Sequence, residues 1–138
     1  MKLYINSRDE LRIIELDRIV YLRASNNYTE FHFADGQTRT YVSCLSAFER
    51  QIADNYDNHS PFVRMGRSYL VNSAYVASIN LQHQTIKFNN DEIITLPKKH
   101  LRVLKEHLLA NMCSLKNMPI SENNPAYFGE DSPEDEQK

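Results

Sequence analysis

The segment from Tyr28 to Ala34 alternates strongly between its two faces, and a pair of turn-forming residues follows it directly. Phe31 and Phe33 fall on one face of an extended chain, whereas the side chains between them fall on the other. Asp35-Gly36 then predicts a two-residue hairpin turn, with residues 37–42 as the returning strand. We therefore expect at least one antiparallel β-hairpin in this chain.

Other short apolar segments predict further strands. They are expected at residues 2–6, within 11–22, at 69–71, at 85–88 and at 93–96. The segment 11–22 holds two apolar runs, which indicate two strands or one strand and a helical turn. Residues 23–27 are polar and are expected to form a loop. Residues 89–92 are expected to join a second hairpin.

Two segments have helical spacing instead. Ser43 is positioned to cap a helix over residues 44–55, and a second helix is expected over residues 97–111. The apolar stripes of these helices are Leu45, Phe48 and Ile52 in the first, and Leu101, Leu104 and Leu108 in the second. The predicted strands separate the two helices, so no helix-turn-helix is expected. The fold class indicated is mainly β, with one mid-chain helix and one C-terminal helix.

The net charge of −2 averages over two unlike parts of the chain. Residues 111–138 hold two bases and six acids, a charge of −4, which leaves 14 bases and 12 acids, or +2, in residues 1–110. Apolar periodicity stops near residue 111. We therefore predict a folded domain over 1–110 and an acidic, disordered tail over 111–138. A charge of +2 permits nucleic-acid binding without requiring it.

An enzyme has little support in the sequence. The three glycines form no phosphate-binding loop, no serine lies in a nucleophile elbow, and the histidines are scattered. His32 is expected on the polar side of the first hairpin, roughly opposite Arg39. Cys44 and Cys113 are far apart, which suggests neither a disulfide framework nor a zinc site. We expect no catalytic residue, no metal, no cofactor and no small-molecule substrate.

The N-terminus is too short and too polar for a signal peptide, and no apolar run approaches the ~18 residues that span a bilayer. A cytoplasmic protein without membrane contact is expected.

Arg64 and Arg67 flank Gly66 in the stretch 62–72. If Gly66 interrupts the strand, both arginines lie on a turn rather than alternating across a sheet. The planar, permanently charged guanidinium suits an anion or a base edge. The simpler interpretation is a pair of solvated arginines at a strand entry.

Two other polar segments also lie at the start of an element. Lys98 and Lys99 lie in the first turn of the last helix, where backbone N–H groups can bind phosphate, and Arg102 shares a flank with Lys98. Asn27 and Tyr28 follow a loop, and their side chains can contact adenine or phosphate. A solvated helix face and an ordinary turn are the alternatives. One β scaffold could present all three segments on a single edge.

The pattern F-x-R-x-x-R-S-x-x-V-N at residues 62–72 resembles the central motif of the LytTR DNA-binding domains of bacterial transcription regulators. The resemblance covers about residues 5–108, with further matches at 15–24, 27–28, 35–36, 45–49 and 96–101. It implies an elongated, antiparallel β fold with few helices, whose loops enter successive major grooves. Family DNA contacts would fall on Asn27 or Tyr28, on Arg67, and on Lys98 or Lys99.

Three departures from the family pattern matter. Gly66 stands where the family usually has histidine, so one polar contact is expected to be missing. Pro97 and two lysines replace a serine and arginines, which favours phosphate clamping over bidentate guanine reading. No receiver domain precedes the motif, so no phosphorylation input is expected in this chain.

The function expected is a stand-alone, sequence-specific, double-stranded DNA-binding transcription regulator, with self-association on repeated half-sites. The residues expected to contact bases are Asn27, Tyr28 and Arg67, and those expected to contact the DNA backbone are Arg64, Lys98, Lys99 and Arg102.

Two rival classes remain open. One is a binder of single-stranded nucleic acid that stacks bases on Tyr28, Phe31 and Phe33. The other is a protein-interaction or ligand-sensing β module without DNA binding.

Overall fold

The computed structural model describes residues 1–57 and 59–111. These residues fall into two units, Met1–Lys105 and a second unit that begins at Glu106. The described residues form ten strands, namely β1 Lys2–Asn6, β2 Leu11–Glu15, β3 Ile19–Ser25, β4 Tyr28–Phe33, β5 Thr38–Val42, β6 Phe62–Met65, β7 Tyr69–Asn72, β8 Val76–Asn80, β9 Thr85–Phe88 and β10 Ile93–Thr95. The two α-helices are α1 Leu45–Ala53 and α2 Lys98–Ala110, and two 3-10 turns cover Leu16–Arg18 and Ser73–Tyr75.

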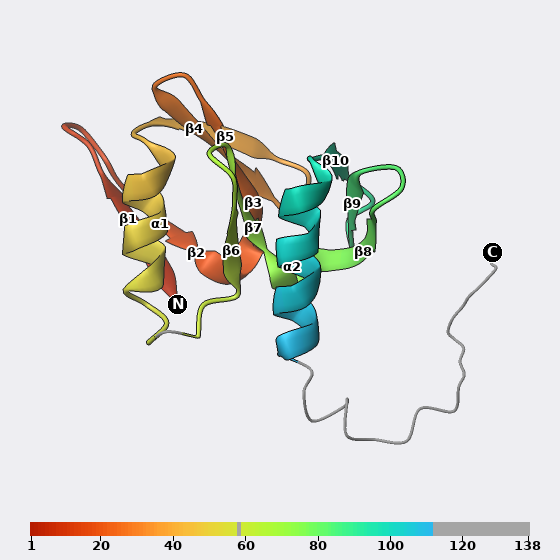
Figure 1. Cartoon of the computed structure of the whole chain (residues 1–138). Helices are drawn as coiled ribbons and strands as arrows, with labels where there is room; N and C mark the ends of the chain where they lie inside the picture. Colours follow the sequence, from red (N-terminus) through yellow and green to blue (C-terminus); the bar gives the residue numbers. More distant parts are fainter. Residues whose placement is uncertain (58, 112–138) are drawn as a thin grey trace. The chain divides into compact units, whose positions relative to one another are not determined.

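The strands form three antiparallel sheets (Figure 1). The central sheet has five strands in the order β5-β4-β3-β7-β6, flanked by the β1-β2 hairpin and by the β10-β9-β8 sheet. The mainly β, antiparallel fold with two helices is confirmed. Five strands separate α1 from α2 along the chain, so these helices do not form a helix-turn-helix.

The hairpin of β4 and β5 is present, but its loop is one residue longer than predicted. Phe33 N–H donates to Gln37 O at 2.9 Å, and Gly36 N–H donates to Phe33 O at 3.0 Å. Gly36 has a φ of 88°. The loop is therefore a three-residue connection with glycine in the left-handed region, which suits the right-handed twist of the strands as well as a two-residue turn does.

The β9–β10 hairpin, also predicted, repeats the same loop. Phe88 N–H donates to Glu92 O at 2.9 Å, and Asp91 occupies the left-handed position with a φ of 72°. Aspartate tolerates this conformation better than most residues with a side chain, which explains why no glycine is needed here.

Two boundaries differ from the predictions. The segment 23–25 belongs to β3, because Arg23 pairs with Glu30 and Ser25 pairs with Tyr28 across the ladder, and only Asn26-Asn27 form the turn. Ladder pairing with β4 thus overrides the polar composition that indicated a loop. Cys44, not Ser43, is the N-cap residue of α1, and no side chain caps that helix.

One face of the central sheet holds the main hydrophobic core. Phe31 is fully buried, with its ring edge-on to Phe48 of α1 at 5.0 Å and to Tyr41 at 5.1 Å between ring centroids. The other members of this core are Leu3, Ile14, Leu16, Ile19, Leu22, Leu45, Ile52, Phe62 and Leu70. The predicted stripe of α1 is thus confirmed as its buried face.

The opposite face of the central sheet is also covered. The Tyr21 ring lies between the ring of His32, at 4.2 Å, and the ring of Phe88 from the β10-β9-β8 sheet, at 5.2 Å. His32 pairs with Thr38 rather than with Arg39, and its side chain is only 14% exposed. His32 contacts the side chains of Glu30 and Thr38, so it lies among polar groups as predicted. That side of the sheet is nevertheless covered, because a second layer of aromatic side chains packs against it.

Candidate nucleic-acid interface

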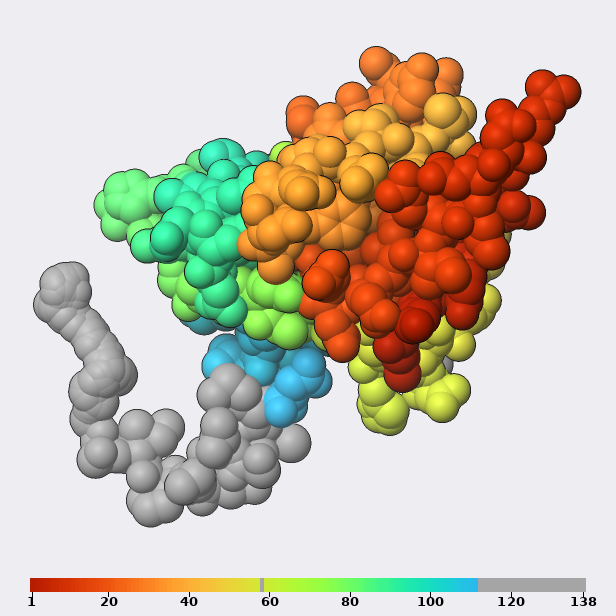
Figure 2. All heavy atoms as spheres, turned by 180° about the vertical axis from the view of Figure 1, so that it is seen from behind, coloured from red at the N-terminus to blue at the C-terminus, as the bar shows by residue number. Residues whose placement is uncertain are grey.

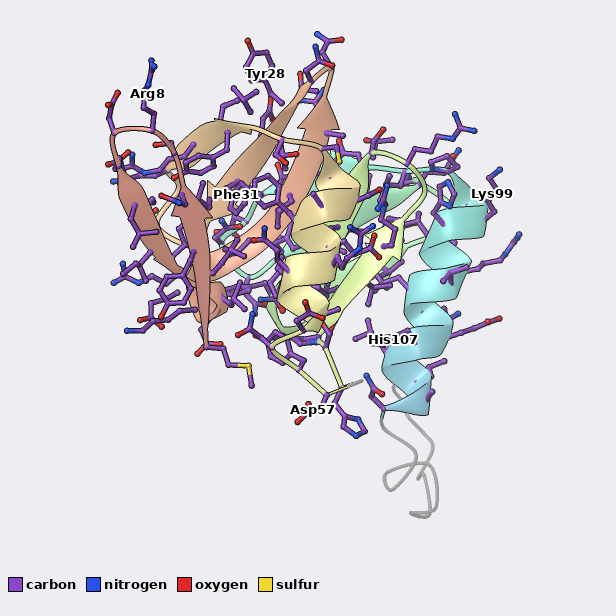
Figure 3. The ribbon with its side chains drawn as sticks, turned by 90° about the vertical axis from the view of Figure 1, so that its left-hand side faces the viewer. Arg8, Tyr28, Phe31, Asp57, Lys99 and His107 are labelled. Atoms are coloured by element: carbon purple, nitrogen blue, oxygen red, sulfur yellow. The ribbon has the colours of Figure 1, made fainter. Side chains whose placement is uncertain are left out.

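The structure brings the three polar segments to one edge of the central sheet. Ala24 N–H, at the end of β3, donates to Ser68 O in the β6–β7 turn at 2.7 Å. A Cβ atom on Gly66, in the same turn, would lie 2.7 Å from Nε2 of His100 in the first turn of α2. The β3–β4 turn at Asn26-Asn27 and the start of α2 are therefore both adjacent to the β6–β7 turn. Figure 3 shows Tyr28 at the top of the molecule, Lys99 at its upper right and Asp57 at the bottom.

Gly66 satisfies two separate requirements of this edge. Its φ of 67° lies in the left-handed region, which a residue with a Cβ atom adopts only with strain. The imidazole of His100 also fills the space that a side chain at position 66 would enter. The glycine that departs from the family pattern therefore lets the first turn of α2 pack directly on the β6–β7 turn.

Arg64 holds the turn in place. It lies in β6, not on the turn as predicted, because the strand extends to Met65. Its Nε donates to Gly66 O at 2.9 Å and its Nη2 to Arg67 O at 3.2 Å, while Nη1 contacts Ser46 Oγ and the Glu49 carboxylate of α1. The two bonded carbonyls belong to the peptide planes on either side of the Arg67 Cα, so Arg64 restrains both backbone dihedral angles of Arg67.

The Arg67 side chain is exposed at the tip of this restrained turn. No ion pair with any residue of the described ranges engages it, so within those ranges its guanidinium donors are unused. Lys98, Lys99 and Arg102 are likewise exposed and without an acidic partner in that part of the chain. The edge therefore presents four uncompensated cations on two restrained elements.

Asn27 and Tyr28 complete the edge. Both are exposed, with Tyr28 at 47%, and Tyr28 begins β4 as the ladder partner of Ser25 and Val42. Asn26 precedes them with a φ of 58°, a conformation that asparagine tolerates. The turn is thus short and fixed at both ends by strand pairing.

The stacking surface of the first rival class does not form. Phe31 has no exposed surface, and Phe33 is partly buried against the same core at the opposite end of β4 from Tyr28. The three rings therefore form no continuous stacking surface.

Two further residues were missed by sequence reasoning. His100 was set aside as one of several scattered histidines, and only its contact with Gly66 distinguishes it. Arg8 lies at the tip of the β1–β2 hairpin and points to the same side as Tyr28 (Figure 3). The turn around Arg8 is visible in the sequence, but the direction in which it points depends on how the hairpin packs.

Among residues 1–57 and 59–111, no cluster of three or more His, Cys, Asp or Glu side chains could hold a metal ion. No helix in those ranges is long and apolar enough to cross a membrane.

Comparison with known protein families matches residues 9–109 to the LytTr DNA-binding domain. The chain belongs to the LytTR family. Among solved structures, the LytTr DNA-binding domain of a putative methyl-accepting/DNA response regulator from Bacillus cereus is similar, with a TM-score of 0.58 and 21% identity over 78% of this chain and 95% of that one. At that identity the likeness shows the fold. No curated protein matches the chain.

The family assignment confirms the resemblance found in the motif at residues 62–72. LytTR domains form a DNA-binding family rather than an enzyme family.

Proposed function

We propose that this LytTR protein is a transcription regulator that binds specific sites in double-stranded DNA, and that the edge formed by the β3–β4 turn, the β6–β7 turn and the start of α2 enters the major grooves. The observation that carries the proposal is the uncompensated guanidinium of Arg67 on a turn restrained by Arg64 and packed on His100. The same proposal includes a DNA-binding domain over residues 1–110, an acidic tail from residue 111 and a cytoplasmic location. Most of the tail lies outside the described residues.

Base reading is assigned to Arg67, Asn27 and Tyr28. A guanidinium can make two parallel hydrogen bonds to guanine, and an asparagine amide can do the same with adenine. Arg67 and the pair Asn27-Tyr28 lie on different turns, which suits contacts to neighbouring base steps or neighbouring grooves. Self-association on repeated half-sites would place two such edges on one operator.

Backbone contacts are assigned to Lys98, Lys99 and Arg102. The first turn of α2 offers free backbone N–H groups and the positive end of the helix dipole, which favour a phosphate. Two lysines at that position repel the dipole in the absence of DNA, and a bound phosphate removes the repulsion. Arg64 remains a candidate for a phosphate contact in addition to its restraint of the turn.

Arg67→Ala tests the proposal by fluorescence anisotropy with a selected operator duplex and a scrambled duplex. The variant should lose preference for the operator by roughly 1–3 kcal/mol while its unfolding transition stays unchanged. Lys2→Ala is the matched control, since Lys2 is an exposed cation paired with Glu15 in the β1–β2 hairpin. Retained discrimination in Arg67→Ala would remove Arg67 as the reader. Competition with single-stranded DNA separates duplex binding from the first rival class.

Arg64→Lys separates the two roles of Arg64. A lysine keeps the charge, so a purely phosphate-directed side chain would lose little affinity. A lysine ammonium cannot reach both turn carbonyls, Ser46 and Glu49 together. We therefore expect Arg64→Lys to reduce operator discrimination while the affinity for scrambled duplex stays the same.

A further inference from the structure

A second feature lies away from the proposed DNA-binding edge. A cavity of about 560 Å³, open to solvent, separates β2 from the loop that joins β4 to β5. Figure 2 shows the N-terminal hairpin, in red, against the orange segment that contains these strands. Tyr28 lies at one end of β4 and Phe33, which lines the cavity, lies at the other, roughly 17 Å along the strand.

The walls of this cavity combine apolar surface with several guanidinium groups. Its apolar lining comes from Ile13, Ile14, Phe33 and Ala34, and its three arginines are Arg12, Arg18 and Arg39. The volume lies in the ~300–1,000 Å³ range of small-molecule sites, which also pair apolar walls with a few polar groups.

Two hydrogen-bonding groups in this lining have no partner. Nε of Arg12 and the hydroxyl of Tyr41 are both buried and unpaired among the described residues. Nη2 of Arg12 bonds Glu10 at 3.0 Å, whereas its Nε has neither an acceptor nor exposed surface. Buried donors without an acceptor destabilise a protein, and such groups are expected to have a partner.

The acids in the lining already have partners of their own. Asp35 accepts from the backbone N–H of Gln37 at 3.0 Å, and Glu15 pairs with Lys2 at 3.5 Å. Three arginines against two acids leave a charge of +1 on the lining. The cavity therefore favours an anion whose acceptor atoms can reach Arg12 and Tyr41.

We propose that this cavity binds a small organic carboxylate with an apolar body. Both donors are closed to solvent in this structure, so the carboxylate reaches Arg12 Nε and the Tyr41 hydroxyl only when the side chains that cover them rotate. Its second oxygen faces the other arginines. The apolar body lies against Ile13, Ile14 and Phe33. An inorganic anion would leave these apolar walls wet, and an uncharged ligand would leave the cationic lining uncompensated.

The test uses the full chain and 4-phenylbutyrate as the probe, with uncharged 4-phenylbutanamide as its isosteric control, followed by backbone amide NMR. The acid should bind saturably, with a Kd on the order of 1 mM or below for a ligand of this size. Amide shifts should be confined to residues 12–18 and 33–41. The uncharged amide should bind at least about tenfold more weakly.

Tyr41→Phe removes the hydroxyl alone and keeps the edge-on ring contact with Phe31. It should weaken binding of the acid by about tenfold without lowering the melting temperature, because the lost hydroxyl is buried and has no partner among the described residues. Arg12→Met should weaken binding similarly, whereas Arg50→Met, an exposed arginine of α1 outside the cavity, should bind as the unchanged chain does.

Any one of four results would overturn the proposal. They are an absence of saturable binding, equal affinity for the acid and the amide, undiminished binding by Tyr41→Phe, and amide shifts centred outside the cavity. None of these results bears on duplex binding, which is measured without the probe.

Discussion

Substitution of Gly66 by alanine tests how the proposed DNA-binding edge is built. Gly66 and Gly36 both have a positive φ, 67° and 88° respectively, so alanine is strained at both positions. They differ in their surroundings. A Cβ atom at Gly36 meets nothing within 4 Å, whereas a Cβ atom at Gly66 lies 2.7 Å from Nε2 of His100. Gly36→Ala is therefore a control with the backbone strain but without the contact.

The cost of the backbone strain and the cost of the contact with His100 can be estimated separately. A left-handed conformation costs an L-residue about 1–2 kcal/mol, and the restricted unfolded chain offsets about 0.4–1 kcal/mol of it. Gly36→Ala should therefore lower the free energy of unfolding by about 1 kcal/mol. Crowding of His100 by Gly66→Ala should add about 1–2 kcal/mol, because the ring can move only partly within a packed helix start. The total for Gly66→Ala is about 2–3 kcal/mol.

Urea unfolding measures both costs, provided that the m-value stays constant. The variants needed are Gly36→Ala, Gly66→Ala, His100→Ala and the double variant Gly66→Ala/His100→Ala. In the His100→Ala background, Gly66→Ala should cost only the ~1 kcal/mol of backbone strain, giving a coupling energy of about 1–2 kcal/mol. Equal losses for Gly66→Ala and Gly36→Ala, or a full Gly66→Ala loss without His100, would refute the packing of α2 on the β6–β7 turn.

Three other outcomes are expected. Lys99→Ala should weaken binding to operator and scrambled duplexes alike, and in a salt titration it should reduce the slope of log K against log salt by roughly one unit. A sequence-selective loss would contradict a phosphate contact. Truncation after Met112 should leave the melting temperature nearly unchanged. In gel shifts it should raise the non-specific affinity for duplex DNA at low salt, and this gain should shrink as salt increases. A large drop in melting temperature would mean that the tail stabilises the domain. Burial first, and then Glu92, raise the pKa of Tyr21, so the folded state keeps the phenol neutral where the unfolded chain ionises. Stability should therefore fall as pH rises above about 10 in alkaline unfolding titrations, with a smaller fall in Tyr21→Phe.

Local signals were sufficient for most of the β architecture. The alternation of residues 28–33 and the Asp35-Gly36 pair predict the β4–β5 hairpin, which the structure contains. The length of its loop could not be predicted, because Asp-Gly fits a two-residue turn and also the last two positions of a three-residue turn. The choice depends on which register buries Phe31, and that is a property of the packed sheet.

The second covered face of the central sheet could not be predicted from alternation. Glu30 and His32 alternate with apolar residues, which is typical of a strand with one solvated face. In the structure Glu30 bonds His32 at 3.1 Å, and His32 stacks on Tyr21. A polar side chain with a local partner can therefore lie in a packed layer, and the partner is invisible until the strands are paired.

The candidate edge shows the same division between local and long-range information. Arg67 stands out in the sequence because it follows a glycine within a recognisable motif, but nothing local says how firmly its turn is held. That restraint comes from Arg64, which bonds the carbonyls on both sides of the Arg67 Cα and is itself held by Glu49, a residue of α1 fifteen positions earlier in the chain. A guanidinium discriminates between bases through paired hydrogen bonds, and a restrained backbone limits the positions from which the side chain can approach a base. The specificity expected of Arg67 thus depends on a helix that need not touch DNA.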